Sequence, residues 1–358
     1  MKIPFGRPLI DLNEKRAVNK VLDSSILTHG KYSIEFEKKF HKYSKINFCT
    51  SVSSCTAALH IAYLLIGLKK KDEVILPCQT HVATAHSIEI TGGKPIFVDS
   101  DNSLTGNIDV NKIEKKINSK TKAICVVHFL GKPVDMDKIM QIAKKHKLYV
   151  IEDCALALGA KYKNKHVGTF GDFSAFSFYP AKHITTADGG ILGMKNKYFY
   201  EKAKLIKAFG VTKRFQERKV PGDYDVKYLG INYRLDEIRS VIGIAQLKKL
   251  NFILKKRENN YKFLNKKIKN FNEIKVVNTN SHKEFKSSFY CLSFILSERL
   301  KKKRLEIIKD LNNAGIGTSI YYPKIIPEFS YYRKKYKINT SDLKNGKLIS
   351  NHSICLPI

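Results

Sequence analysis

Lys182 lies in a connecting loop after an apolar segment, and its amine is the first candidate for chemistry. Residues 173–178 (FSAFSF) alternate large apolar and small side chains and predict a buried strand. Such a strand would bring Ser177 and Lys182 to one loop. A lysine is ordinarily a solvated charge in a chain this rich in lysine, whereas a lysine in a cleft can act as a nucleophilic amine.

Other polar side chains stand at the ends of predicted strands. Apolar strand-like segments alternate with amphipathic helical segments along the first half of the chain. This alternation predicts an α/β fold with a largely parallel sheet, in which ligands bind beyond the carboxyl ends of the strands. The polar residues at or just after such ends are Ser54, Cys55, Thr56, His81, His128, Asp153 and Ser177.

These residues match the three requirements of a pyridoxal phosphate (PLP) site. PLP needs a lysine for a Schiff base, a carboxylate that keeps the pyridine nitrogen protonated, and N–H and hydroxyl donors for the phosphate. Asp153 precedes Lys182 by 29 residues, with a further predicted strand between them. Adjacent strands can therefore present both side chains to one cleft. Ser177 and residues 54–56 would supply phosphate donors.

Residues 53–56 (SSCT) directly precede the apolar helical segment 57–68. Hydroxyl side chains at this place are typical of helix N-caps. The free N–H groups of a helix start also bind anions. Taken alone, the pattern is equally compatible with a simple capped helix.

The composition is that of a globular protein with 43% hydrophobic and 27% charged residues. No apolar segment approaches the roughly 18 residues that span a bilayer, and the first residues do not resemble a secretory signal. The seven cysteines show no CxxC spacing and no zinc-like cluster. We therefore expect a cytoplasmic protein with reduced thiols, no metal site and no membrane association.

The net charge of +33 raises the possibility of nucleic-acid binding. The lysine runs recur at helical spacing among leucines and isoleucines, as in residues 247–271, which indicates solvated helix faces. No nucleic-acid-binding motif accompanies them, and the chain has neither GxGxxG nor GxxxxGK[ST]. We expect no nucleic-acid partner; attraction of a phosphorylated substrate is an alternative role for the charge.

A lysine-rich, mostly helical composition begins near residue 248. We place a domain boundary there, with a large domain at 1–247 and a smaller α+β domain at 248–358. Within the second domain we expect a helix at 306–315 and strands at 289–296 and 318–323. Tyr321 and Tyr322 in the last of these would line a substrate site or pack in the core.

The ordered blocks of the sequence resemble the DegT/DnrJ/StrS family of PLP-dependent sugar aminotransferases, which have the fold-type I architecture. The resemblance runs from about residue 8 to the last residue and extends over many blocks of sequence. It is carried by SSCTAALH (53–60), DEVILPCQTHVATAHS (72–87), IEDCALALGA (151–160), GTFGDFSAFSFYPAKHITTADGG (168–190) and LGINYRLDEIRSVIGIAQLKKL (229–250). Relatives continue into a further helix after SICLPI (353–358); either the protein lacks that helix or the sequence ends before it.

The resemblance implies a role for each matching residue. Lys182 would form the Schiff base with PLP, and Asp153 would pair with the pyridine nitrogen. His81 stands where the family usually stacks an aromatic ring on the cofactor. The phosphate would be bound by Thr56, the backbone N–H of Ala57 and the hydroxyl of Ser177.

Asn232, in the GINYR block, matches a residue that reaches the phosphate bound by the partner subunit. The resemblance therefore implies a homodimer with shared active sites. Arg234 is expected to be structural or to lie on the substrate side.

Four departures from the family pattern fall near the expected site. Cys55 replaces the usual glycine of the phosphate turn, and Leu156 replaces a glutamine or histidine that commonly meets the cofactor's ring oxygen. Ala187-Asp188 replaces Gly-Glu before the glycine pair, and Phe209 replaces a common histidine. These changes would alter how the cofactor is tuned.

The resemblance implies transfer of an amino group from an amino acid, L-glutamate, to a keto carbon of a nucleotide-diphosphate hexose. Such a reaction would serve surface-polysaccharide or related amino-sugar biosynthesis. One alternative is a PLP-dependent sugar dehydratase on the same scaffold, in which histidine replaces the lysine; the retained Lys182 weighs against it. A second alternative is a non-catalytic regulator that uses the basic helices.

Overall fold

In the computed structural model, which describes residues 2–101, 105–213, 217–277 and 284–358, the centre of the fold is a seven-stranded mixed sheet. Its strand order is β1-β9-β8-β5-β4-β2-β3, and only β9 runs antiparallel to its neighbours. The predicted largely parallel sheet is therefore correct. The strands are β1 (Phe48–Val52), β2 (Glu73–Pro77), β3 (Lys94–Val98), β4 (Thr121–Val127), β5 (Tyr149–Asp153), β8 (Phe173–Ser177) and β9 (Gly190–Met194).

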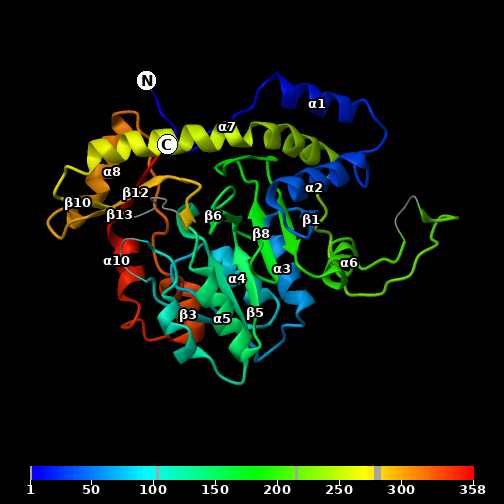
Figure 1. The fold of residues 1–358 in the computed structure, drawn as a ribbon, viewed down its shortest axis with the longest axis horizontal. Helices are drawn as coiled ribbons and strands as arrows, with labels where there is room; N and C mark the ends of the chain where they lie inside the picture. The colour runs from blue at the N-terminus through cyan, green and yellow to red at the C-terminus, as the bar shows by residue number, and fades with distance from the viewer. Residues whose placement is uncertain (1, 102–104, 214–216, 278–283) are drawn as a thin grey trace.

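Helices cover the sheet and bury its continuous apolar strands (Figure 1). Residues of α3 pack against β8 and β9, and α5 packs against β5. Burial of both faces explains why the strands read as apolar runs rather than as alternating patterns. The helices of this part are α1 (Leu12–Leu22), α2 (Lys31–Ser44), α3 (Cys55–Leu65), α4 (Val82–Ile90), α5 (Met136–His146) and α6 (Lys197–Ile206).

The later part of the chain forms a second, smaller sheet with order β10-β12-β13, all antiparallel. A third small sheet, β11-β6-β7, joins a strand from this part to two from the first part. The strands are β6 (Lys161–Tyr162), β7 (Lys165–His166), β10 (Ile274–Val276), β11 (Phe285–Lys286), β12 (Leu292–Leu296) and β13 (Ser353–Leu356). The helices are α7 (Glu237–Ile268), α8 (Arg304–Asn313), α9 (Ser330–Tyr336) and α10 (Lys344–His352).

The 32-residue helix α7 links the two parts of the molecule and crosses the predicted boundary at residue 247 without a break. Its first half packs against α1 and α2, and Figure 1 shows it running on to the small sheet. The division into domains 1–247 and 248–358 therefore stays a prediction.

Two predicted strands of the smaller part need correction. Residues 318–323 were expected to form a strand, but they form only an isolated bridge between Ser319 and Cys355. The expected strand 289–296 begins at Leu292, because Phe289 has a φ of +51° and turns the chain before the ladder starts.

Candidate active site

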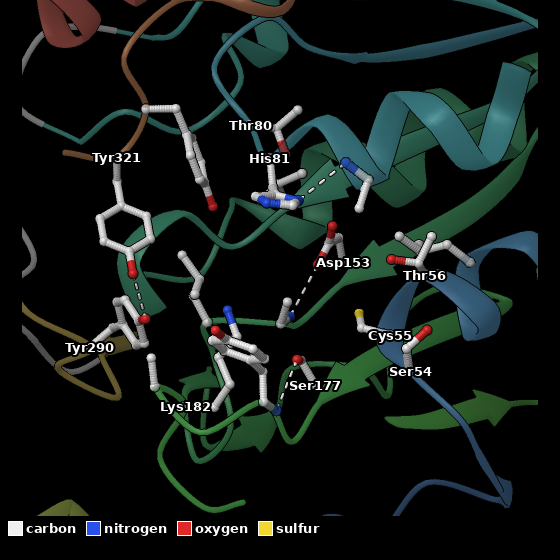
Figure 2. A pocket seen from close by; sticks show the side chains of 18 of the residues that line it. Ser54, Cys55, Thr56, Thr80, His81, Asp153, Ser177, Lys182, Tyr290 and Tyr321 are labelled. Carbon is white, nitrogen blue, oxygen red and sulfur yellow. Dashed lines mark hydrogen bonds between the residues drawn. The ribbon is translucent and has the colours of Figure 1, made fainter. Parts of the chain in front are cut away.

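A cavity of about 420 Å³ lies at the carboxyl ends of β1, β2, β4, β5 and β8, as the sequence predicts for a parallel sheet. Figure 2 shows the labelled side chains pointing into it from several elements. The start of α3 forms one side, and Tyr290 and Tyr321 form the opposite side. Five of the predicted site residues line this cavity: Thr56, His81, Asp153, Ser177 and Lys182.

Lys182 is half-buried in the loop between β8 and β9, where its backbone N–H donates to the carbonyl of Tyr179 at 2.9 Å. Its Nζ atom lies 5.6 Å from the centroid of the Tyr290 ring. Desolvation lowers the pKa of the Lys182 amine below its usual value, and the nearby Cys55 and Asp153 groups oppose this only in part. A lysine with a depressed pKa carries a neutral, nucleophilic amine more often than a solvated lysine does.

Asp153 ends β5 and is fixed by two hydrogen bonds. The Thr84 hydroxyl donates to Oδ2 at 2.8 Å, and the N–H of Ala155 donates to Oδ1 at 3.0 Å. Because the proton of Thr84 is used on Asp153, the 2.8 Å contact between Thr80 and Thr84 places the Thr80 hydroxyl as the donor. This relay sets the orientation of a carboxylate that is only 5% exposed.

The turn between β1 and α3 forms one end of the cavity. Ser54 caps α3 by accepting a hydrogen bond from the Ala57 N–H at 3.1 Å. The other N–H groups of the first turn have no partner within the helix. An added Cβ on Gly190 would lie 2.6 Å from the carbonyl carbon of Ser54, so only glycine lets β9 pass this close to the turn.

The opposite wall consists of tyrosines from the smaller part of the chain. The hydroxyls of Tyr290 and Tyr321 lie 2.7 Å apart, and Tyr322 is the next residue of the wall. His81 meets Tyr322 edge-on, with ring centroids 5.6 Å apart. Tyr321 and Tyr322 also pack against an apolar cluster, and their contact with a substrate stays a prediction. Tyr290 was not singled out from the sequence, because nothing local to it marks a site.

Two predicted cofactor residues lie outside the lining of the cavity. Ala57 is buried, and its N–H is used by Ser54. Asn232 is exposed, forms an isolated bridge with Ala208 and does not line the cavity of its own chain. Arg234 lies with its guanidinium 5.0 Å from the ring centroid of Phe209. The roles of Ala57 and Asn232 toward the phosphate stay predictions.

The departures from the family pattern fall on the cavity wall in three places. Leu156 lines it and is 3% exposed, so it offers apolar contact where a hydrogen-bonding side chain was expected. Burial, with a smaller effect from Asp153, raises the pKa of the Cys55 thiol well above its usual value. The thiol therefore stays neutral and adds no negative charge beside a phosphate. Asp188 also lines the cavity and accepts a hydrogen bond from Gly189 at 2.8 Å.

His128 and His183 were candidates for catalytic roles, but each has a structural role in the fold. His128 is fully buried; its Nε2 lies 3.0 Å from Glu152, and its Nδ1 accepts from the N–H of Val134 at 3.1 Å. His128, Glu152 and Cys154 lie close enough together to ligate a metal ion. Glu152, however, also accepts hydrogen bonds from three backbone N–H groups, which satisfy its carboxylate without a metal. His183 hydrogen-bonds the carbonyl of Ser288 at 3.0 Å and does not line the cavity.

The model of the DegT/DnrJ/EryC1/StrS aminotransferase family matches residues 8–358. This chain belongs to that family. The predicted fold class and the expectation of an aminotransferase are thereby confirmed.

Named relatives cover nearly the whole chain. A GDP-perosamine synthase of Escherichia coli O157:H7 is 41% identical over 342 residues, which are 94% of this chain and 88% of that protein. A UDP-4-amino-4,6-dideoxy-N-acetyl-β-L-altrosamine transaminase of Campylobacter jejuni is 37% identical over 335 residues, which are 93% of this chain and 86% of that protein.

Solved structures of sugar aminotransferases superpose closely on this aminotransferase. PseC of Helicobacter pylori, an aminotransferase of pseudoaminic acid biosynthesis, has a TM-score of 0.91 at 30% identity and covers 100% of this chain and 94% of its own. A sugar aminotransferase of Streptococcus pneumoniae in its PLP form has a TM-score of 0.92 at 25% identity, with 100% and 93% covered. With the family match, these likenesses confirm PLP as the expected cofactor.

The chemistry of the cavity fits this cofactor. One end offers the hydroxyls of Thr56 and Ser177 and the start of α3, which suit a phosphate. The other groups are a fixed carboxylate, Asp153, and an amine with a depressed pKa, Lys182.

No helix in the described part of the chain is long and apolar enough to cross a bilayer.

Proposed function

We propose that this aminotransferase moves an amino group from an amino acid to a keto carbon of a nucleotide-linked sugar. The observation that carries the proposal is the half-buried Lys182 amine, with its lowered pKa, in one cavity with Asp153 and the start of α3. The names of the two relatives given above refer to a GDP-linked and a UDP-linked sugar, which supports a nucleotide-linked sugar as the substrate. A relative in Bacillus subtilis, 30% identical over 364 residues, is a spore coat polysaccharide biosynthesis protein, which supports a role in polysaccharide synthesis.

The residues of the cavity divide the work. PLP, when bound, supplies a carbonyl carbon that takes up the amino group and a ring that withdraws electrons. Lys182 would hold the cofactor through its amine, and the free amine would move a proton at the α-carbon of the amino donor, as general base and then as general acid. Burial lowers the pKa of this amine, which favours its neutral, proton-accepting form.

Asp153 and the hydroxyl residues hold the cofactor in place. Asp153 would accept a hydrogen bond from the protonated ring nitrogen, and Thr84 keeps the carboxylate turned for it. Thr56 and Ser177 would bind the phosphate beside the start of α3. The wall of Tyr290, Tyr321 and Tyr322 would exclude water and contact the sugar.

We further propose a homodimer in which Asn232 of one subunit reaches the phosphate site of the other. The support is an exposed apolar surface on two segments, the first helices and the connection between α6 and α7. The described part of that connection extends beyond the rest of the molecule at the side of α6 (Figure 1). The exposed apolar residues there are Phe209, Val220, Tyr224, Val226 and Leu229.

The proposed location is the cytoplasm. All seven cysteines are free thiols, and six of them are buried. This arrangement suits a reducing compartment, where such residues serve as small apolar side chains.

Incubation of the purified protein with PLP, L-glutamate and a panel of GDP- and UDP-linked keto-sugars tests the function. We expect release of 2-oxoglutarate and a sugar product whose mass and NMR spectrum show an amino group at C3 or C4. The Lys182→Ala variant serves as the control and should give neither product. A deoxygenated sugar without 2-oxoglutarate would instead indicate a dehydratase; His183, which does not line the cavity, does not supply the histidine such an enzyme uses.

A further inference from the structure

A second cavity, of about 560 Å³, adjoins the active-site cavity and is more open to solvent. The two cavities share Thr56, His81 and Ala83, so the starts of α3 and α4 form a common border. The second cavity, termed the α4–α9 groove below, follows α4 and is closed on its far side by α9. Its remaining lining residues are Val82, His86, Glu89, Ile90, Tyr331 and Lys335.

Hydrogen bonds between α4 and α9 hold the far wall of the groove in place. Glu89, whose side chain is 6% exposed, accepts hydrogen bonds from Lys335, Tyr336 and the Tyr331 hydroxyl, the last at 3.2 Å. His86 Nδ1 lies 2.9 Å from the Tyr332 hydroxyl, and the two rings stack with centroids 5.6 Å apart. A wall fixed in this way loses little conformational freedom when a ligand binds.

The groove presents a flat ring and a cation side by side. Tyr331 is 52% exposed although its hydroxyl is tied to Glu89, which leaves its ring open to the groove. Lys335 Nζ lies 5.5 Å from the centroid of that ring. An ammonium group has three donors, and Glu89 and Tyr331 use two of those on Lys335. One donor thus remains for an anionic ligand.

We propose that the α4–α9 groove binds the nucleoside diphosphate half of the substrate. Tyr331 stacks against the base and Lys335 contacts a diphosphate oxygen, while the sugar passes Thr56 and His81 into the active-site cavity. The inference rests on the proposed function, because only an elongated substrate with a reactive end and an anionic aromatic end would fill both cavities. Aromatic stacking is tolerant of the base, which suits either a purine or a pyrimidine.

Fluorescence anisotropy of the methylanthraniloyl esters of GDP and UDP, titrated with the PLP-loaded enzyme, tests this site. We expect Tyr331→Ala to weaken binding of the better probe about tenfold, because the base loses the ring on which it stacks. Tyr331→Phe, which keeps the ring, should bind within about twofold of wild type. Lys335→Ala should also weaken binding, and the effect should shrink as salt is raised.

Two matched controls come from the same chain. Lys334→Ala removes an exposed lysine from the same helix outside the groove, and Tyr198→Ala removes a tyrosine that is 60% exposed on α6. Both should bind the probe as wild type does. Visible absorbance of bound cofactor should be normal in all variants, which shows that the fold and the PLP site are intact.

The outcomes separate the two proposals. If wild type binds a probe and Tyr331→Ala and Lys335→Ala bind it equally well, the groove is not the nucleotide site, and the proposed function stands. If wild type binds neither probe yet carries PLP and converts glutamate to 2-oxoglutarate, the nucleotide-linked substrate itself is wrong. Weakened binding in the Tyr331→Ala and Lys335→Ala variants, with unchanged controls, supports the groove.

Discussion

At the scale of single residues, Lys182 shows how a common side chain becomes a reactive one. The chain is rich in lysine, and most of its lysines lie on the surface. Lys182 differs because the loop after β8 places its amine between the Tyr290 ring and the Asp153 side of the cavity. Burial there lowers its pKa, which favours the neutral amine that the proposed chemistry requires.

The same burial should make Lys182 a source of instability in the PLP-free protein. The folded pKa lies below the unfolded value, so between the two values the unfolded state binds more protons and stability rises with pH. We therefore expect Lys182→Met to raise the thermal midpoint of the PLP-free protein at about pH 7, and the gain to shrink as the pH approaches about 10.4, the usual lysine pKa.

Thermal unfolding of the PLP-free wild type and variant across this pH range provides the measurement. Lys334→Met, at an exposed lysine of α9, is the matched control and should show no such pH-dependent gain. A gain that grows with pH, or that is absent at neutral pH, would show that the Lys182 amine is not desolvated.

At the scale of elements, the connection from β8 to β9 carries most of the unusual backbone near the site. Ala187 has a φ of +67°, a left-handed conformation that a side chain disfavours. Its N–H donates to the Thr185 hydroxyl at 3.0 Å, which holds the turn in that conformation. The family's usual glycine at this place would adopt it without strain, so the alanine costs stability while it preserves the path of the chain.

Replacing Ala187 with glycine should therefore stabilise the protein. Relief of a left-handed alanine is worth ~1–2 kcal/mol, and the added freedom of glycine in the unfolded chain removes ~0.4–1 kcal/mol of that gain. We expect urea unfolding to show a net gain of about 0.5–1 kcal/mol.

Ala143→Gly, at a buried position of α5, is the comparison, because there the backbone is helical and glycine should cost at least about 1 kcal/mol. Equal losses at both positions would contradict the strain at Ala187.

The sequence predicted these elements well where local signals exist. The strand before Lys182, the strand that ends in Asp153 and the helix capped by Ser54 all have apolar patterns or capping residues of their own. Residues 318–323 have a strand-like composition, yet they form a single bridge, between Ser319 and Cys355 at the edge strand β13. Pairing between distant segments decides such cases, and no local pattern encodes it.

At the scale of the whole molecule, the site is complete only because distant segments meet. The tyrosine wall comes from residues 290 and 319–322, far along the chain from Lys182 and Asp153. In the same way, α9 closes the α4–α9 groove although it lies far along the chain from α4. Spacing in the sequence could not predict these contacts. Lys182, Asp153 and Ser177, to which the resemblance assigns roles, line one cavity, but the resemblance did not indicate the Thr80–Thr84–Asp153 relay or Tyr290.

The proposed homodimer makes a prediction at this scale. Leu229 is 93% exposed on the connection between α6 and α7, where a partner subunit would cover it. Light scattering should give wild type a mass of twice 40.9 kDa. Leu229→Glu should shift the population toward a monomer, because a charge buried in an interface without a partner is strongly unfavourable.

Leu305→Glu, at a leucine that is 70% exposed on α8, is the matched control and should leave the dimer intact. A wild-type protein that is monomeric at all concentrations would contradict the shared active sites.

The central claim is that Lys182, among all the lysines of this chain, holds the cofactor. Borohydride reduction of the PLP-loaded protein turns the carbon–nitrogen bond to the cofactor into a stable one, and peptide mass spectrometry then locates it. We predict one labelled peptide, the one that contains Lys182, and no labelled peptide at that site in Lys182→Ala. A label on a different lysine, or no label after loading with PLP, would contradict the account.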